Sequence, residues 1–150
     1  IPTGRRSWDD ATRDMWPSLP VTEPTKYQQA IALPPGQPLL IQRVGTTYRD
    51  GVARPQVRAA GQQSFTIRAL GKGSGGHWRQ ADIWDGESLR VATPRVLARL
   101  QGFPDSFYWE CRDALAAEAI GNAVPPPLAA ALFDRVAAAI GGWQAKEKVA

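Results

Sequence analysis

Residues 90–127 read RVATPRVLARLQGFPDSFYWECRDALAAEAIGNAVPPP, and this stretch decides how the second half of the chain folds. Thr93 is a residue type that caps helix N-termini, and Pro94 suits the first helical position. Apolar residues then recur at helical spacing until Gly102, a residue that commonly ends helices. The pattern predicts a helix over about 94–101.

A Gly-Asn pair followed by three prolines comes after a second helical run. Gly121 tolerates positive φ and Asn122 is a frequent turn residue, so the pair predicts a tight turn that breaks the chain. Proline can open a new helix, and the Ala-rich run over about 126–140 predicts the best helix of the chain, stopped by Gly141 and Gly142. Its apolar residues form one stripe: Leu128, Ala131, Leu132, Val136 and Ile140.

The two segments together resemble the last two motifs of the DNA cytosine-5 methyltransferases. The residues that match the penultimate motif are Arg90, Thr93, Pro94, Arg95, Arg99, Leu100, Gln101, Gly102, Phe103, Pro104 and Asp105. Those that match the last motif are Ile120, Gly121, Asn122, Ala123, Val124, Pro125 and Pro126. The departures are Ala92, Val96, Ala117, Glu118 and Ala119. Two motifs in the right order and spacing are more specific than either alone.

This resemblance implies a role in DNA methylation, as in restriction-modification enzymes, with S-adenosylmethionine as cofactor. In the family, a target-recognition region faces the major groove of double-stranded DNA, and the last motif returns to the catalytic domain beside the cofactor. By that likeness, Gly121, Asn122 and Ala123 would line the cofactor pocket. The family's Pro-Cys and Glu-Asn-Val motifs are absent from this sequence, so it offers no catalytic residue and the isolated chain is expected to be inactive.

Cysteine and histidine each occur once, which excludes an internal disulfide framework and gives no metal site. Cys111 does not follow a proline, and we expect it to be a small packed residue. A single cysteine fits a reducing compartment, so we expect a cytoplasmic location. We see no apolar run near the roughly 20 residues that span a membrane and expect no membrane association.

Positive charge is concentrated in the middle of the chain. The formal net charge is +4, yet residues 43–79 carry seven Lys or Arg residues against Asp50 alone. Clustered basic residues are typical of contact with a phosphate backbone, although a solvated basic surface gives the same pattern. The predicted DNA-binding residues are Arg43, Arg49, Arg54, Arg58, Arg68, Lys72, His77 and Arg79.

Upstream of the motifs the pattern predicts a short helix and a few strands. Ser7 could cap a docking helix over residues 8–16. Residues 38–44 are rich in apolar residues and predict a strand, and Asp50-Gly51 is a hairpin signal. Residues 63–70 alternate between polar and apolar, which predicts a half-buried strand with Phe65 and Ile67 toward the core. Gly71–Gly76 predicts a loop that approaches DNA or lies at the surface.

We therefore expect an α+β fold in which residues 1–92 form a small irregular β-containing recognition region. Residues 93–150 would form two or three helices, the last of which packs on a catalytic domain absent from this chain. The first residue is Ile rather than Met, and the length suits either an excised fragment or the second subunit of a split enzyme. Two alternatives remain open, namely a stand-alone basic DNA-binding module and a structural interaction domain.

Overall fold

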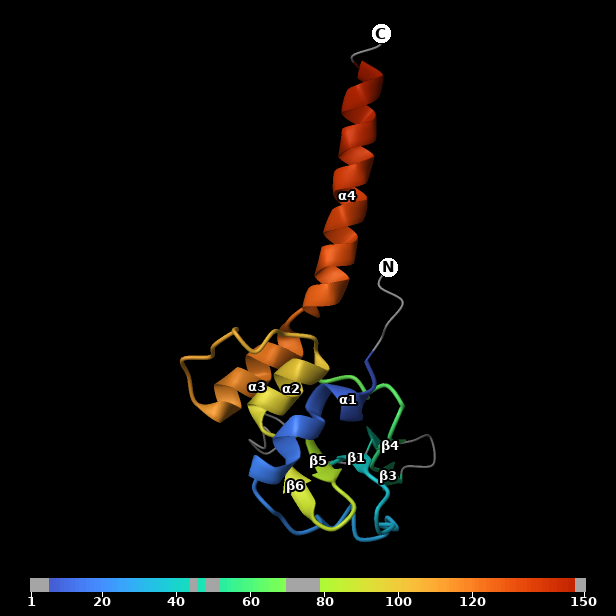
Figure 1. Cartoon of the computed structure of the whole chain (residues 1–150), viewed down its shortest axis with the longest axis vertical. Coiled ribbons are helices and arrows are strands. Elements are labelled where there is room, and N and C mark those ends of the chain that lie inside the picture. The colour runs from blue at the N-terminus through green and yellow to red at the C-terminus, as the bar shows by residue number, and fades with distance from the viewer. Residues whose placement is uncertain (1–5, 44–45, 48–51, 70–78, 148–150) are drawn as a thin grey trace.

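The computed structural model describes residues 6–43, 46–47, 52–69 and 79–147. Its elements are α1 (Trp8–Thr12), the 3₁₀ helix η1 (Arg13–Ser18), β1 (Leu39–Gln42), β2 (Thr46–Thr47), β3 (Ala53–Arg54), β4 (Val57–Ala59), β5 (Ala81–Trp84), β6 (Leu89–Val91), α2 (Pro94–Leu100), α3 (Asp113–Asn122) and α4 (Pro126–Glu147). After α1 and η1, the strands precede the remaining helices, and the α+β class is confirmed (Figure 1).

Four strands form one antiparallel sheet in the order β4-β1-β5-β6. The predicted strand over 38–44 is confirmed as β1, and Leu40 lies opposite Arg58 on one side and Ile83 on the other. A turn at Asp85 joins β5 to β6, and the Asp85 N–H donates to the Ser88 carbonyl at 3.1 Å. The strands β2 and β3 pair with each other, but the Asp50-Gly51 turn predicted between them lies outside the described residues.

The hydrophobic core draws on both halves of the chain. Leu40 and Ile83 project from the sheet into a cluster with Trp8, Leu97 and Ile120, all at most 1% exposed. Residues before β1 reach the sheet as well, since Trp84 Nε1 donates to the Pro34 carbonyl at 2.8 Å and Gln28 Nε2 donates to Asp82 at 2.9 Å. Because the core is shared, α1 and the sheet fold together with α2 and α3.

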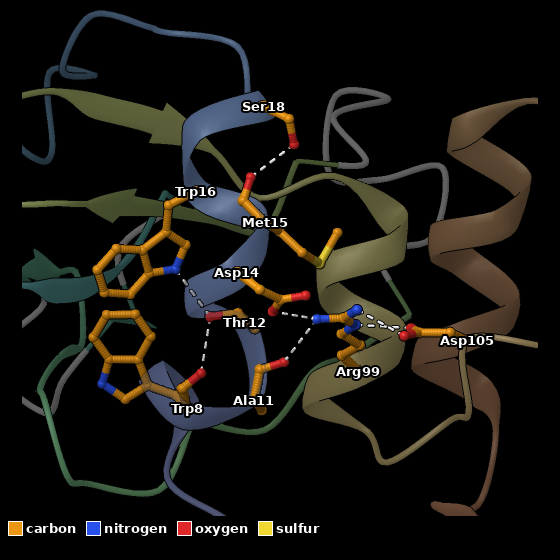
Figure 2. Close-up of polar contacts among 9 residues, drawn as sticks. All are labelled: Trp8, Ala11, Thr12, Asp14, Met15, Trp16, Ser18, Arg99 and Asp105. Atoms are coloured by element: carbon orange, nitrogen blue, oxygen red, sulfur yellow. Dashed lines mark hydrogen bonds and ion pairs between the residues drawn. The ribbon is translucent and has the colours of Figure 1, made fainter.

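The first helix is confirmed near its predicted place and is short. Ser7 occupies the N-cap position, and its hydroxyl accepts from the Asp10 N–H at 3.4 Å. The α-helix ends at Thr12 and continues as η1, which contains Pro17. Trp16 Nε1 donates to Thr12 Oγ1, which donates to the Trp8 carbonyl, and the two indoles stack at 5.6 Å (Figure 2). This helix therefore docks through its tryptophans, as predicted.

The strand predicted over residues 63–70 is wrong, although its alternation is right. Phe65 and Ile67 are buried and Thr66 and Arg68 are exposed, yet the described residues of this segment join no sheet. Side chains fix the segment in place of a ladder, because the Arg68 N–H donates to Gln80 Oε1 at 2.8 Å. Alternating burial reports which side of an extended chain meets the core and says nothing of its backbone partners.

Helix α4 begins as predicted and ends later. It extends through Gly141 to Glu147, so the prediction that the glycine pair stops it was wrong. A helical glycine costs only about 1 kcal/mol relative to alanine, and the Ala-rich run before it favours the helix. Figure 1 shows α4 projecting away from the rest of the molecule, and every residue from Leu132 to Gly141 is exposed.

One helical stretch meets the length and composition needed to cross a membrane, which corrects the expectation that no apolar run approaches this length. The stretch is Asp113–Gly141, within which an 18-residue window has a mean hydropathy of 1.3 and is not buried in the structure. Ala123 has an extended backbone and divides the stretch into α3 and α4. Ala116, Ala117 and Ile120 of α3 are buried in the protein core, and one helix of this length and composition is weak evidence for a membrane span.

Candidate functional site

Helix α2 forms one side of the candidate site. Thr93 holds the predicted N-cap position with Pro94 after it, but its side chain makes no capping hydrogen bond. At the other end, the Gly102 and Phe103 N–H groups donate to the carbonyls of Arg99 and Ala98 at 2.9 and 3.0 Å. This is the Schellman pattern, and it explains why Gly102 has a φ of +83°. The predicted glycine stop is confirmed.

The two motifs contact each other at the ends of α2 and α3. A Cβ added to Gly102 would lie 2.8 Å from both Cδ and Cγ of Pro127, in the first turn of α4. Gln101 Nε2 donates to the Ile120 carbonyl at 3.2 Å. We call the group formed by Gln101, Gly102, the range 120–123 and Pro127 the motif junction.

Gly121 lies inside the last turn of α3, so the predicted tight turn at Gly121-Asn122 is wrong. Among the described residues only Gly36, Gly61, Gly86 and Gly102 have positive φ. The backbone of another segment approaches Gly121 closely. A Cβ at this position would lie 2.2 Å from the Arg68 carbonyl carbon and from the Ala69 nitrogen, and 2.4 Å from the Arg68 oxygen. Gly121 is thus required by a contact with another segment rather than by its own φ.

Asn122 and Ala123 lie beside Gly121 at the surface end of α3. The Asn122 side chain is exposed, and no hydrogen bond joins its amide to a described residue. Ala123 is the C-cap and its N–H donates to the Ile120 carbonyl at 3.3 Å. The Asn122 amide therefore keeps one acceptor and two donor hydrogens for a ligand outside this chain.

Arg99 on α2 links α1 and η1 to the loop that follows α2. Its guanidinium contacts Asp14 at 2.5 Å and Asp105 at 2.6 and 2.7 Å, and donates to the Ala11 carbonyl at 3.4 Å (Figure 2). The hydrogen bonds to Asp105 and then Asp14 hold the pKa of Arg99 above its ordinary value. The same bonds hold the pKa of each carboxyl below its ordinary value. One motif arginine thereby fixes two segments.

Of the predicted DNA-binding residues, Arg43 lies in a buried ion pair. Its Nη1 contacts both Asp82 carboxylate oxygens at 2.8 and 2.9 Å, and Asp82 is 0% exposed. Burial raises the pKa of the Asp82 carboxyl above its ordinary value, against hydrogen bonds from Gln28 and Arg43. Removing a cation that pairs with a buried carboxylate strongly destabilises a protein, so Arg43 has a structural partner here.

The remaining predicted residues occupy different positions. Arg58 on β4 donates to Gln56 Oε1 and to the Val57 carbonyl at 3.1 Å, whereas Arg54 and Arg68 are exposed and Arg79 is half-buried. Three lie outside the described residues: Arg49, Lys72 and His77. Residues 71–76, predicted as a glycine loop, lie wholly outside the described residues.

The loop between α2 and α3 carries an aromatic cluster and the free cysteine. The rings of Phe103, Phe107 and Trp109 lie within 4.7–5.4 Å of one another, measured between centroids. Cys111 is exposed, so the expectation that it is packed was wrong, because it precedes α3 instead of lying on its buried side. In the parts of the chain that the structure describes, no group of three or more His, Cys, Asp and Glu could hold a metal ion.

Two features of the site were not foreseen from the sequence. The first is the Arg99 contact with Asp14, which joins residues far apart in the chain. The second is the packing of Gly121 on Arg68 and Ala69. A carboxylate on the first helix and a glycine in a helix interior are the available signals, and neither identifies its partner.

Comparison with known proteins places this sequence in a family. The model of the C-5 cytosine-specific DNA methylases matches residues 12–138. The chain is 50% identical over 45 residues to the type II methyltransferase M.HgiCI of Herpetosiphon aurantiacus, which is 30% of this chain and 11% of that protein. Over 55 residues it is 42% identical to M.HpaII of Haemophilus parainfluenzae, covering 37% of this chain and 15% of that protein.

A plant protein gives a similar result. The chain is 46% identical over 54 residues to DNA (cytosine-5)-methyltransferase 2 of Arabidopsis thaliana, covering 36% of this chain and 4% of that protein. No solved structure matches. The matches thus span less than a fifth of the length of each of these relatives. Because the family model covers most of the sequence, including both motifs and the sheet, the chain belongs to the C-5 cytosine-specific DNA methylases.

Proposed function

We propose that this chain is the target-recognition and cofactor-site-completing portion of a DNA (cytosine-5-)-methyltransferase. The observation that carries the proposal is the motif junction, where the two family motifs contact each other while Asn122 stays exposed. Residues 1–92 would contact double-stranded DNA, and residues 93–150 would join a catalytic domain or subunit. This is a division of roles within one folded body, because both ranges supply the core. A protein that acts on DNA in this way would work in the cytoplasm, as in restriction-modification.

The residues of the motif junction fit S-adenosylmethionine in part. Asn122 has an exposed amide without a hydrogen-bond partner among the described residues, and Ala123 is adjacent, so both could hold a polar ligand. The space beside Gly121 is filled by the backbone of Arg68 and Ala69. Gly121 would therefore support the cofactor pocket from within the protein rather than contact the cofactor through this face. S-adenosylmethionine supplies the methyl group when bound, and the partner would supply the nucleophile that this sequence lacks.

Helix α4 supports the need for a partner. Its side chains at Leu128, Leu132, Val136 and Ile140 are 52–55% exposed, and Phe133 is 72% exposed. Apolar side chains repeated along one helix face are unfavourable in water, and a partner would bury them. The N-terminal end of α4 lies at the motif junction, so a partner seated on α4 would also approach Asn122.

Reconstitution of methyl transfer tests the proposal. The pure chain, incubated with duplex DNA and labelled S-adenosylmethionine, should transfer no methyl group, because the sequence contains no Pro-Cys. Addition of a catalytic subunit that carries the missing motifs should produce labelled cytosine. Methyl transfer by the pure chain that is lost in Cys111→Ser would contradict the proposal. The proposal would also be contradicted if no methyl transfer occurred with any catalytic subunit that lacks the last two motifs itself.

Asn122→Ala tests the cofactor role. In the reconstituted complex we expect cofactor affinity to fall by about 1–3 kcal/mol, the cost of leaving one buried polar contact unmade. Isothermal titration with S-adenosylmethionine measures this change, and Glu118→Ala on the exposed side of the same helix is the control. Unchanged affinity with a lower melting temperature would instead assign Asn122 a capping role.

A stand-alone DNA-binding module is the second candidate, and it is favoured by the exposed arginines Arg54 and Arg68. Salt-dependent DNA binding without any productive catalytic partner would support it. A chain that binds no DNA and assembles with another protein would instead be a structural interaction domain.

A further inference from the structure

The backbone at Arg68 is held by residues of two other segments. The first is Gly121, whose added Cβ would come within 2.2–2.4 Å of the Arg68 carbonyl group and the Ala69 nitrogen. Contacts below 3.0 Å do not occur at real Cβ atoms, and backbone atoms cannot swing aside as a flexible side chain can. Since Gly121 is an ordinary helical residue, this packing is the reason that the position requires glycine.

The second is Gln80, just before β5. Its Oε1 accepts the Arg68 N–H at 2.8 Å, and its own carbonyl accepts the Arg43 N–H at 2.9 Å. The Gln80 side chain is only 6% exposed, and its Nε2 has no hydrogen-bond partner among the described residues. Burying the Gln80 amide with an unpaired N–H donor costs folding free energy. The hydrogen bond that its oxygen accepts from Arg68 offsets part of that cost.

The side chains around Arg68 complete the restraint. Phe65 and Ile67 are 5% and 3% exposed and anchor the segment in the core, which turns Arg68 to the surface. Its guanidinium makes no hydrogen bond or ion pair with a described residue, in contrast to Arg43 and Arg58. The result is an exposed guanidinium that pairs with no residue in the described part of the chain, on a backbone that is packed at its carbonyl and hydrogen-bonded at its N–H.

We infer that Gly121 and Gln80 are positioning residues that hold Arg68 for a contact with DNA. A guanidinium forms two parallel hydrogen bonds with a planar pair of acceptors. A fixed backbone favours this contact because it holds the side chain near the required orientation. On DNA such a pair is offered by a phosphate group or by the O6 and N7 atoms of guanine. The inference rests on the proposed function, and it gives Gly121 a role on the DNA side of the protein as well as beside the cofactor.

The test measures binding of the full chain to fluorescent duplexes as a function of salt. Two duplexes of equal length are used, one built from G·C pairs and one from A·T pairs. Arg68→Ala should weaken binding about fivefold or more. An equal loss on both duplexes with a log–log salt slope reduced by about 0.9 assigns a phosphate contact, and a loss confined to the G·C duplex assigns a guanine contact.

Gly121→Ala and Gln80→Met should each reproduce part of the Arg68→Ala loss and add little to it in double variants. The matched control is Gly141→Ala, a helical glycine with nothing within 4 Å of an added Cβ, which should bind as the parent chain does. A merely structural defect would lower affinity whether or not Arg68 is present. If Gly121→Ala does not fold, judged by circular dichroism, Gln80→Met decides.

Three results separate the two ideas. No DNA binding by the parent chain would contradict the proposed recognition role. Normal parent binding that Arg68→Ala leaves unchanged would overturn this inference alone. Losses in Gly121→Ala and Gln80→Met that add fully to that of Arg68→Ala would overturn it as well, because the positioning residues would then act elsewhere.

Discussion

Replacing Gly102 by alanine tests whether the contact between the two motifs stabilises the chain. Gly102 has a φ of +83°, and its Cβ would lie 2.8 Å from two atoms of Pro127. Alanine in the left-handed region costs about 1–2 kcal/mol, partly offset because alanine restricts the unfolded chain. Ordinary contact begins at 3.4 Å, so Pro127 would have to retreat by about 0.6 Å. Overpacking of this kind costs about 1–3 kcal/mol, so we expect a total of about 2–4 kcal/mol.

A matched glycine separates the two contributions. Gly61 has a φ of +79° and nothing within 4 Å of an added Cβ, so Gly61→Ala should cost about 1 kcal/mol from the backbone alone. Urea unfolding followed by tryptophan fluorescence gives both free energies, and similar m-values would show that the unfolded states are comparable. Equal losses of stability in the two variants would refute the reasoning, since the Pro127 contact would then contribute nothing.

Three further predictions concern the ion pairs and α4. Arg99→Met should lower the urea midpoint and increase hydrogen exchange in η1, because the contact of Arg99 with Asp14 is lost; unchanged exchange would contradict a tie between these segments. Burial raises the pKa of Asp85, but hydrogen bonds from Arg90 and the turn outweigh it and leave the pKa below its ordinary value. Its stabilisation should therefore be present above about pH 4 and lost as the pH falls further, and Asp85→Asn should flatten that part of the pH–stability curve. Leu132→Asp should leave the isolated chain equally stable and weaken assembly with a catalytic subunit, whereas Ala130→Asp should affect assembly less.

Local sequence patterns predicted the ends of several elements. Pro94 and Gly102 delimit α2 because both act on their own backbone, one through its fixed φ and the other through its tolerance of positive φ. Alternation at Phe65 and Ile67 predicted correctly which side chains enter the core. These features depend on residues within one helical turn or one strand, and the sequence contains that information directly.

Long-range partners were not predictable in this way. The basic segment suggested that Arg43 faces DNA, yet its partner is Asp82, which the sequence presents only as a residue in an apolar strand. The Gly-Asn pair suggested a turn, but tertiary packing keeps Gly121 helical and uses its missing side chain for contact with Arg68. A sequence gives the size and charge of such residues, whereas their partners depend on how distant segments meet.

The two motif glycines share one physical role, because each lets another segment approach a helix closely. Gly102 lets Pro127 approach α2, and Gly121 lets the Arg68 backbone approach α3. A side chain at either position would separate segments that must stay in register for Asn122 and Arg68 to keep their relative placement. Because Asn122 directly follows Gly121, a ligand that restrains Asn122 would also restrain the contact that holds Arg68. Under the proposed function, the residues beside the cofactor and the residue that contacts DNA are therefore joined through a single turn of helix, and a change at one should be measurable at the other.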